Sequence, residues 1–326
     1  MKAILYKDGC TADELKFGEV ETPSPSSKQI LVKVNAAGVN RADVMQREGY
    51  YPPPKGTSTV LGLEIAGVVF DTGSGVTRWK KGDKVFGLIP GGGYAEYAIL
   101  EEEMAMPLPA SLSMSDAAAI PEVFLTAYQA LIYYGKIQSG ETALIHAGAS
   151  GVGTAAIQIA REMSANIIIT SSKEKHEACI KLGAEKAIDY KHEDFYKEVM
   201  KYTGGNGVDV IVDFIGGPYL QKNINCLKTD GRLIMLSLLG GSKVSELDIR
   251  SMIGKRLSII GSALRSRSLD YRIKLVKDFS AFALEKFAVC KLHPVIDKVY
   301  NWKDAAEAHK RIEANKNTGK IVLEIN

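Results

Sequence analysis

The stretch that decides the fold of this chain is Ile145-His146-Ala147-Gly148-Ala149-Ser150-Gly151-Val152-Gly153-Thr154-Ala155-Ala156. A hydrophobic run enters a glycine-rich turn, and the residues after the turn have the pattern of a helix. Glycine here permits a tight bend and lets the first N–H groups of the helix approach a pyrophosphate. Against the GxGxxG pattern, Ser150 replaces the middle glycine and Gly151 stands beside it. A purely structural turn would not need three glycines in six residues, so we predict a dinucleotide-binding loop.

Alternating strand and helix patterns surround this loop. The expected strands in this part of the chain are near-continuous apolar runs, which are typical of strands covered by helices on both faces. Six such strands separated by helices predict a doubly wound parallel sheet, an α/β fold of the Rossmann type. The expected strands are 142–146, 167–170, 187–189, 208–214, 232–238 and 257–261, and the expected helices include 126–134, 152–163 and 174–182.

The two ends of the chain differ from this middle part. Short β-branched runs at 30–34, 66–70, 84–88 and 97–100 are separated by glycine and proline clusters, which predicts a small barrel-like domain. The tail adds an amphipathic helix at 269–287, a short strand, a helix at 302–315 and a strand at 320–325. We therefore expect a discontinuous outer domain, 1–121 and 266–326, interrupted by a nucleotide-binding domain, 122–265.

Composition narrows the functional class. The 326 residues are 46% hydrophobic and 24% charged, and 41 Lys and Arg against 38 Asp and Glu leave a net charge of +3. The charges are scattered, whereas a nucleic-acid-binding protein usually concentrates them, so we expect no nucleic-acid partner. Four distant cysteines form neither a zinc motif nor a disulfide framework. The apolar runs are too short for a signal peptide or a membrane span, so a cytoplasmic protein without membrane association is expected.

The end of the second strand bears on cofactor choice. Roughly 20 residues after the glycine loop, a site that prefers NAD places an Asp or Glu against the ribose 2′-hydroxyl. This chain instead has Thr170-Ser171-Ser172-Lys173-Glu174-Lys175, and small hydroxyls followed by lysines suit a 2′-phosphate. Glu174 falls inside the next predicted helix, between two cations. We therefore predict NADPH; the alternative is that Lys173 and Lys175 are ordinary solvated lysines.

Several further segments occur in a characteristic order along the whole chain. They are Gly38-Val39-Asn40-Arg41-Ala42-Asp43, Tyr51-Pro52-Pro53-Pro54, Leu61-Gly62-Leu63-Glu64, Leu88-Ile89-Pro90-Gly91-Gly92-Gly93, Ala118-Ala119-Ile120-Pro121-Glu122, Leu264-Arg265-Ser266-Arg267 and 313–320. With the glycine loop, they resemble the zinc-free quinone oxidoreductase (zeta-crystallin-like) branch of the medium-chain dehydrogenase/reductase superfamily. The likeness is greatest to the tumour-suppressor-inducible quinone oxidoreductase subgroup, and it implies a GroES-like outer domain.

Departures from the zinc alcohol dehydrogenases within this superfamily are informative. Where those relatives have a cysteine ligand after Gly-Val, this chain has Asn40, and where they have the histidine of Gly-His-Glu, it has Leu63. The four-cysteine structural zinc lobe is absent as well. Without a Lewis acid to polarise a carbonyl, alcohol oxidation is not expected, and we predict no metal site.

The resemblance also implies roles for individual residues. Asn40 and Tyr51 would line the nicotinamide pocket as the catalytic candidates, and Thr126 would lie beneath the ring. Tyr51 alternatively packs only against the three prolines after it, and Asn40 only caps a turn. The other expected cofactor contacts are Gly151, Val152 and Gly153 at the diphosphate, Ser171, Ser172, Lys175 and Tyr190 around the 2′-phosphate, Leu239 and Leu264 after strands five and six, and Asn315, where some relatives have arginine.

The expected activity is NADPH-dependent transfer of reducing equivalents to a quinone. The resemblance also implies a homodimer joined through the sheet edge near the sixth strand. One alternative is an enone or enoyl-thioester reductase, for which Tyr51 is the obvious proton donor. A second alternative is a non-enzymatic, crystallin-like NADPH-binding protein, because fold alone does not dictate function.

Overall fold

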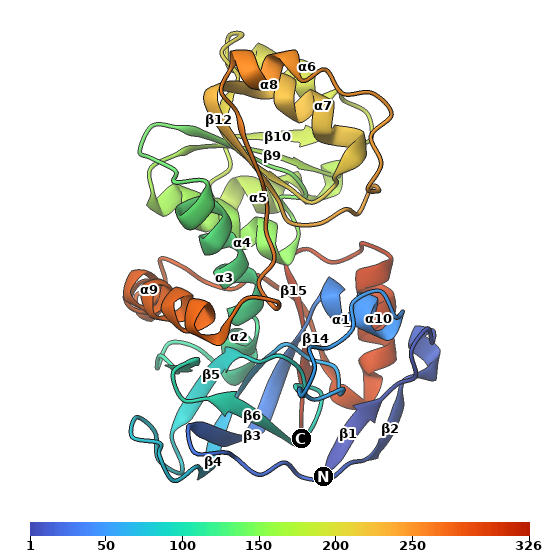
Figure 1. Ribbon diagram of the computed structural model, residues 1–326, viewed down its shortest axis with the longest axis vertical. Helices are drawn as coiled ribbons and strands as arrows, with labels where there is room; N and C mark the ends of the chain where they lie inside the picture. Colours follow the sequence, from blue (N-terminus) through green and yellow to red (C-terminus); the bar gives the residue numbers. More distant parts are fainter. The chain divides into compact units, whose positions relative to one another are not determined.

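The computed structural model describes residues 1–326, and the chain divides into two units. The first unit joins Met1–Leu125 to Arg265–Asn326, and the second is the intervening segment Thr126–Leu264. Both chain ends therefore belong to the first unit (Figure 1). None of the helices combines the length and the apolar composition that a membrane-spanning helix needs.

The second unit contains a six-stranded sheet in the order β10-β9-β8-β11-β12-β13, with every neighbouring pair parallel. This order confirms the predicted doubly wound sheet, and its strand order reverses between β8 and β11, where such folds bind ligands. The elements are η2 (Gln129–Tyr134), β8 (Thr142–Ile145), α4 (Gly151–Glu162), β9 (Asn166–Ser171), η3 (Lys173–Lys175), α5 (His176–Leu182), β10 (Lys186–Asp189), α6 (Phe195–Tyr202), β11 (Val208–Asp213), α7 (Gly217–Cys226), β12 (Leu227–Met235), α8 (Arg250–Gly254) and β13 (Ser258–Gly261).

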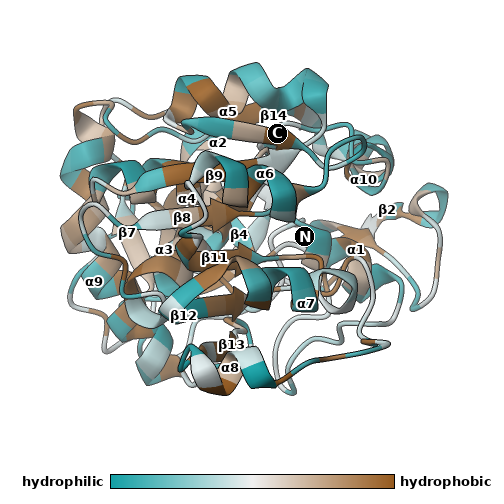
Figure 2. Cartoon of the chain, turned by 90° about the horizontal axis from the view of Figure 1, so that it is seen from above, coloured by the Kyte–Doolittle hydropathy of each residue, from teal (hydrophilic) through white to brown (hydrophobic).

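Burial explains why these runs form strands. Every residue of β8 is buried, as are all residues of β11 except Asp209. In Figure 2, β8 and β11 are coloured mainly as hydrophobic, whereas the surrounding helices carry hydrophilic residues as well. Strands covered by helices on both faces need such continuous apolar sequence.

Two predicted elements are wrong at their ends, and a third is divided into two elements. The fifth strand ends at Met235 rather than 238, because the chain then turns so that the N–H groups of Leu239 and Gly240 bond to the loop after β11. The helix expected at 126–134 begins earlier, as α3 (Pro121–Tyr128), because the first helical position does not need the N–H that proline lacks. It then continues as a π-helical turn. The helix expected at 174–182 is the 3₁₀ turn η3 followed by α5.

The first unit is built on a seven-stranded sheet. Its order is β14-β15-β3-β4-β5-β7, and β6 also pairs with β3; β1 and β2 form a separate antiparallel pair. The elements are β1 (Lys2–Leu5), η1 (Ala12–Glu14), β2 (Lys16–Glu19), β3 (Gln29–Val39), α1 (Arg41–Arg47), β4 (Glu64–Thr72), β5 (Lys84–Leu88), β6 (Tyr97–Glu101), β7 (Ala105–Pro107), α2 (Met114–Ala118), α9 (Leu269–Ala288), β14 (Ile296–Asn301), η4 (Trp302–Asp304), α10 (Ala305–Glu313) and β15 (Lys320–Glu324).

The C-terminal strand completes this sheet. β15 pairs antiparallel with β3, with Ile321 opposite Val39, and parallel with β14. This register brings Lys320 next to the end of β3, where Asn40 follows. The short helices α1 and α2 were not expected, because the sequence predicts only short strands and turns before residue 120. Residues 40–43, which begin α1, are held by a hydrogen bond from the Asn40 N–H to Asp43 Oδ2 (2.8 Å).

Candidate functional site

The glycine loop lies at the carboxyl end of β8 and leads into α4. Ser150 is the N-cap residue of α4, and its hydroxyl accepts the N–H of Gly153 (3.0 Å). A Cβ at Gly153 would lie 2.6 Å from the carbonyl oxygen of Gly148, and a Cβ at Gly148 would lie 2.6 Å from Ile169. These two glycines therefore permit the close packing that the turn needs.

The first N–H groups of α4 fit a diphosphate. The structure gives those of Gly151 and Val152 no hydrogen-bond acceptor, and both residues are partly exposed. The N-terminus of a helix carries partial positive charge, so free N–H groups there suit an anion. Gly151 and Val152 thus form an accessible helix start, whereas Gly153 is buried and its N–H donates to Ser150.

A buried chain of hydrogen bonds connects the start of the glycine loop to β9 and α7. His146 is fully buried; its Nδ1 lies 3.0 Å from the Thr170 hydroxyl, and its Nε2 lies 2.8 Å from the Asn223 amide oxygen. An amide oxygen can only accept, so Nε2 carries the proton and Nδ1 accepts from Thr170. The Thr170 hydroxyl in turn accepts the N–H of Ala147, which has a left-handed φ of 48°. Burial lowers the pKa of His146 to about 4, so the ring is neutral.

The residues expected around a 2′-phosphate meet at the next two strands. Ser171 ends β9, Ser172 follows it, and Lys175 ends the turn η3. The N–H of Tyr190, which follows β10, donates to the carbonyl oxygen of Ser171 (3.3 Å). The side chain of Tyr190 is about half exposed. These four predicted residues are therefore neighbours at one edge of the sheet.

Glu174 lies in the same turn as Lys175. A hydrogen bond from Ser172 and the nearby charge of Lys191 lower the pKa of the Glu174 carboxyl, so it is ionised. Lys191 Nζ lies 3.7 Å from this carboxylate. Three lysines (Lys173, Lys175 and Lys191) thus lie in this turn and after β10, and the acidic residues Asp189 and Glu193 lie at the end of β10 as well.

The remaining predicted contacts of the second unit follow other strands. Leu239 lies after β12 and is 53% exposed, whereas Leu264 lies after β13 and is 6% exposed. Because all six strands are parallel, these residues share the carboxyl edge of the sheet with the glycine loop. Thr126 lies in α3 instead and is partly exposed.

In the first unit, Asn40 belongs to a buried polar cluster. Its amide oxygen accepts from Lys320 Nζ (2.6 Å), and its Nδ2 donates to Glu64 Oε1 (2.8 Å). Lys320 Nζ also contacts Glu64 Oε1 at 2.6 Å and donates to the carbonyl oxygen of Val39 at 2.8 Å. All three ammonium donors are thereby used. Glu64 Oε2 accepts the N–H of Glu122 (2.8 Å), so the cluster ties β3, β4, β15 and α3 together.

A second buried chain adjoins this cluster. Asp43 accepts the N–H groups of Asn40 and Gly62, and the hydroxyl of Tyr94 donates to it at 3.3 Å. Burial raises the pKa of Asp43 to about 6. Arg47 donates to His309 Nδ1, so Nε2 carries the proton toward the Tyr94 oxygen, each pair at 3.3 Å. Burial, with the charge of Arg47, lowers the pKa of His309 to about 3.

Tyr51 is held by Arg265. The guanidinium carbon lies 5.2 Å from the centre of the Tyr51 ring. Arg265 Nη2 donates to the Pro90 carbonyl oxygen (2.6 Å) and to Gln46 Oε1 (2.8 Å), which fixes the cation. Burial raises the pKa of Tyr51 above its usual value; the charge of Glu122 adds to this, and Arg265 opposes it.

Asn315 is oriented by the first unit. Its backbone is left-handed, with a φ of 53°, and its amide oxygen accepts from the guanidinium of Arg41 at 2.7 Å. Arg41 also donates to the carbonyl oxygen of Ile312 at 2.6 Å. The predicted cofactor contact of Asn315 stays a prediction.

Four residues of the first unit were not identified as site residues from the sequence: Glu64, Glu122, Arg265 and Lys320. Each lies in or beside a segment that carries the family resemblance, which was the available signal. The contacts of these residues join parts of the chain as distant as β3 and β15, and such pairings are not visible in sequence spacing.

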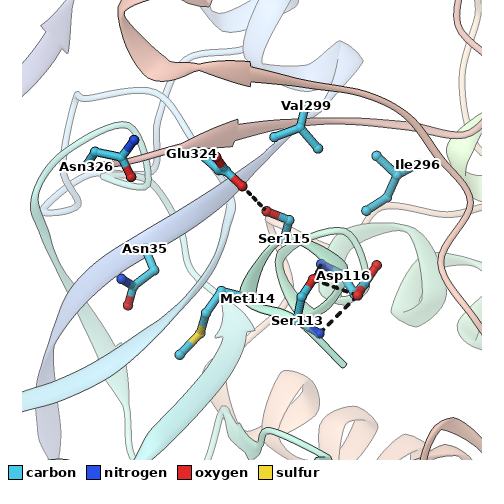
Figure 3. Close-up of a pocket in the computed structure, with 9 residues that line it drawn as sticks. All are labelled: Asn35, Ser113, Met114, Ser115, Asp116, Ile296, Val299, Glu324 and Asn326. Carbon is cyan, nitrogen blue, oxygen red and sulfur yellow. Dashed lines mark hydrogen bonds between the residues drawn. The ribbon is translucent and has the colours of Figure 1, made fainter. Parts of the chain in front are cut away.

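A surface pocket of about 550 Å³ lies elsewhere in the first unit (Figure 3). Its polar groups largely bond to one another: the Ser115 hydroxyl donates to Glu324, and the Ser113 hydroxyl donates to Asp116. None of the predicted site residues lines it. The lining residues are Asn35, Ser113, Met114, Ser115, Asp116, Ile296, Val299, Glu324 and Asn326.

The residues at the position of the catalytic zinc of the alcohol dehydrogenases do not fit that metal. Zinc binds deprotonated cysteine, neutral histidine or free carboxylate. Here Asn40 offers an amide, Leu63 offers no donor, and the Glu64 carboxylate is already paired with the Lys320 ammonium. No group of three or more His, Cys, Asp or Glu residues is placed to hold a metal ion.

Comparison with known proteins agrees with both units. Residues 26–110 match the alcohol dehydrogenase GroES-like domain, and residues 151–281 match the zinc-binding dehydrogenase family. The chain is 32% identical to Homo sapiens quinone oxidoreductase, over 99% of this chain and 97% of that protein. Its fold is similar to that of Escherichia coli quinone oxidoreductase complexed with NADPH, with a TM-score of 0.89, 28% identity and 100% coverage of both chains. It is also similar to the CurK enoyl reductase, with a TM-score of 0.88, 28% identity, and coverage of 100% of this chain and 99% of that one.

The predicted architecture, a Rossmann-type sheet inserted in a GroES-like domain, is confirmed by these matches and by the strand order. The identity to a quinone oxidoreductase extends over nearly the whole of both chains, so it is not limited to the nucleotide-binding part. The protein is an oxidoreductase that belongs to the quinone oxidoreductase family of the medium-chain dehydrogenases/reductases.

Proposed function

We propose that this protein is a zinc-independent reductase that uses NADPH to reduce quinones. The observation that carries the proposal is the whole-length similarity to quinone oxidoreductases in a chain whose Asn40, Leu63 and Glu64 do not form a zinc site. The two units correspond, in this proposal, to an outer substrate domain and an NADPH-binding domain.

The choice of NADPH rests on charge. Lys173, Lys175 and Lys191 lie near the carboxyl ends of β9 and β10, and the hydroxyl residues Ser171 and Ser172 directly precede Lys173. A phosphate attached to the ribose would be stabilised there by charge-assisted hydrogen bonds. The free N–H groups of Gly151 and Val152 would hold the diphosphate. When bound, NADPH supplies a hydride.

The residues of the outer unit would orient the acceptor. Tyr51 has a fixed ring, because Arg265 stacks on it and three prolines follow it. Asn40 is fixed by Glu64 and Lys320. A quinone is already electron-poor, so alignment of donor and acceptor is the main requirement, and alignment contributes up to about 7–11 kcal/mol.

A second function, reduction of an enone or enoyl thioester, is favoured by one observation, the similarity to the CurK enoyl reductase. The Tyr51 hydroxyl has no hydrogen-bond partner in the structure, so it is available to an enolate oxygen. However, its raised pKa makes it a weak acid at neutral pH.

The assay that tests the proposed function follows NADPH and NADH oxidation with a quinone, a simple enone and a crotonyl thioester. We expect turnover with the quinone and NADPH to have the highest kcat/KM. A higher kcat/KM with the thioester would favour the alternative. Tight NADPH binding without turnover of any acceptor would overturn both.

The proposed active form is a homodimer. β13 pairs with β12 on one side and is the edge strand of its sheet, and an open strand edge can pair with another chain. Nearby residues are apolar and exposed, with Ile253 at 76% and Ile249 at 56%. Light scattering should give twice the chain mass, and Ile260→Arg in β13 should give monomers. A wild-type monomer at micromolar concentration would contradict this.

A further inference from the structure

Glu122 has an unusual place in α3. It is the second residue of this helix, and its N–H is fixed by Glu64 Oε2 at 2.8 Å. In α3, only Glu122 and Thr126 are partly exposed, while the other six residues are buried. Residues four apart in a helix share a face. A carboxyl and a hydroxyl therefore lie on the one face of α3 that solvent or a small molecule can reach.

The Glu122 carboxyl makes no hydrogen bond or ion pair, although charged groups lie close to it. Glu64 and Asp43 contribute negative charge, Lys320 and Arg265 contribute positive charge, and Tyr51 is also within electrostatic reach. The three N–H donors of the Lys320 ammonium are bound to Val39, Asn40 and Glu64. Arg265 donates to Pro90 and Gln46. Neither cation is therefore bonded to Glu122.

This environment favours the neutral acid. Burial, reinforced by the charge of Glu64, raises the pKa of Glu122 to about 8. A carboxyl group with a pKa near the working pH is suited to proton transfer. It can give up a proton at neutral pH and regain one from water.

We propose that the carboxyl of Glu122 is a catalytic residue that delivers a proton to the oxygen of the acceptor as the acceptor is reduced. This inference rests on the proposed quinone reduction. The quinone takes up two electrons and one proton as a hydride from NADPH, which leaves as NADP⁺. The resulting anion takes a second proton from Glu122: the carboxylic O–H bond breaks, an O–H bond forms on the acceptor oxygen, and water reprotonates the carboxylate.

The neighbouring groups are less suited to this step. Both Glu64 oxygens accept hydrogen bonds, and the fully buried Asp43 accepts two backbone N–H groups. The pKa of Tyr51 lies above its ordinary value, so the phenol holds its proton more tightly than Glu122 does. Glu122 is thus the accessible acid with the smallest cost of proton release at neutral pH.

The test compares kcat for a quinone in the wild type, Glu122→Gln and Glu122→Asp between pH 6.5 and 9.5. Glutamine keeps the size of the side chain but cannot donate an acidic proton. We expect Glu122→Gln to lower kcat at pH 7 by about tenfold or more. General acids typically contribute about 10²–10⁴-fold, but quinone oxygens also take protons from water. The wild-type kcat should fall above pH 8, the glutamine variant should lose this decline, and aspartate should restore part of the rate.

Two controls separate chemistry from structure. Glu103→Gln, in an exposed turn, removes one carboxylate elsewhere and should keep both the rate and the pH profile. The protein without NADPH gives a readout that does not depend on turnover: infrared difference spectra between pH 7 and 9 should show loss of a protonated carboxyl in the wild type and not in Glu122→Gln.

The outcomes are distinguishable. If the wild type reduces no quinone, the proposed function fails and the role of Glu122 falls with it. If the wild type is active but Glu122→Gln keeps its kcat within twofold and retains the decline above pH 8, the proton-donor role alone is overturned. Absence of a carboxyl titration near pH 8 in the infrared spectra would also overturn it.

Discussion

The guanidinium of Arg265 stacks on the ring of Tyr51, with its central carbon 5.2 Å from the ring centre. The two residues are 214 positions apart in the sequence. A cation over an aromatic face contributes about 0.5–2 kcal/mol, depending on its exposure. The bonds from Arg265 to Pro90 and Gln46 prevent the cation from moving away. The contact therefore fixes the ring and leaves the hydroxyl unbonded.

This geometry predicts different effects for the ring and the hydroxyl of Tyr51. With a quinone as acceptor, Tyr51→Phe should keep kcat within a few-fold, because the phenol is not needed as an acid. Tyr51→Ala should lose more, because the acceptor is no longer aligned. Steady-state kinetics on a quinone and an enone would measure both. A hundredfold drop for Tyr51→Phe on the enone, with efficient enone reduction by the wild type, would instead favour the enone reductase.

Lys175 should determine cofactor preference. A charge-assisted hydrogen bond to the 2′-phosphate contributes roughly 1.5–3 kcal/mol. Lys175→Ala should therefore raise the KM for NADPH about tenfold or more and leave that for NADH nearly unchanged. The matched control is Lys181→Ala, which removes an exposed lysine paired only with Glu177 and should change neither value. Equal losses for both cofactors would show that Lys175 does not recognise the phosphate.

Gly153 should tolerate no side chain. A methyl group there would press on the Gly148 carbonyl oxygen, 2.6 Å away, and overpacking of this kind costs about 1–3 kcal/mol. Gly153→Ala should lower the unfolding free energy and weaken NADPH binding, as measured by denaturant titration and fluorescence. In the control variant Gly254→Ala, the added methyl group has no neighbouring atom within 4 Å, so neither the unfolding free energy nor NADPH binding should fall. Full NADPH affinity in Gly153→Ala would contradict the proposed diphosphate site.

His309 should make stability depend on pH. Its pKa is about 3 in the folded protein and about 6.5 in an unfolded chain. The unfolded state therefore binds more protons between these values, so the His309 contribution to stability is lost as the pH falls below about 6.5. Asp43, with its folded pKa raised to about 6, acts in the opposite direction: its contribution to stability increases as the pH falls from about 6 to about 4. The contribution of His309 is therefore measured by comparing the wild type with a variant at this position.

In His309→Gln, the amide can still accept from Arg47 and donate to Tyr94. The unfolding free energy should therefore fall less steeply from pH 7 to pH 4.5 than in the wild type. Urea titrations at several pH values would measure this slope. An identical slope in both proteins would mean that His309 is not the group responsible.

Removal of metal should leave the activity intact. The Glu64 carboxylate is bound by Lys320, and Asn40 and Leu63 supply no zinc ligand. Activity should survive exhaustive EDTA treatment, and elemental analysis should find far less than one zinc per chain. Stoichiometric zinc together with chelator-sensitive activity would contradict the zinc-independent reaction.

The parallel sheet could be predicted because each of its strands can be recognised from its own short stretch of sequence. Strands such as β11 are continuous apolar runs, and the glycine loop marks where β8 meets α4. The short helices α1 and α2 were missed because a helix of five or seven residues has too few turns for a periodic pattern. The end of β12 was misplaced because the bonds that end it come from the loop after β11.

The sequence by itself determined the fold class, the glycine loop before α4 and the hydroxyl and lysine residues after β9, because each depends on residues close together in the chain. Only the tertiary structure decided the cluster of Asn40, Glu64 and Lys320, the stacking of Arg265 on Tyr51 and the position of Glu122. These contacts join residues up to 280 positions apart. Local sequence cannot encode such contacts. The pairing of β15 with β3 brings Lys320 to Asn40 and Glu64, and burial within the folded unit raises the pKa values of Glu122 and Asp43.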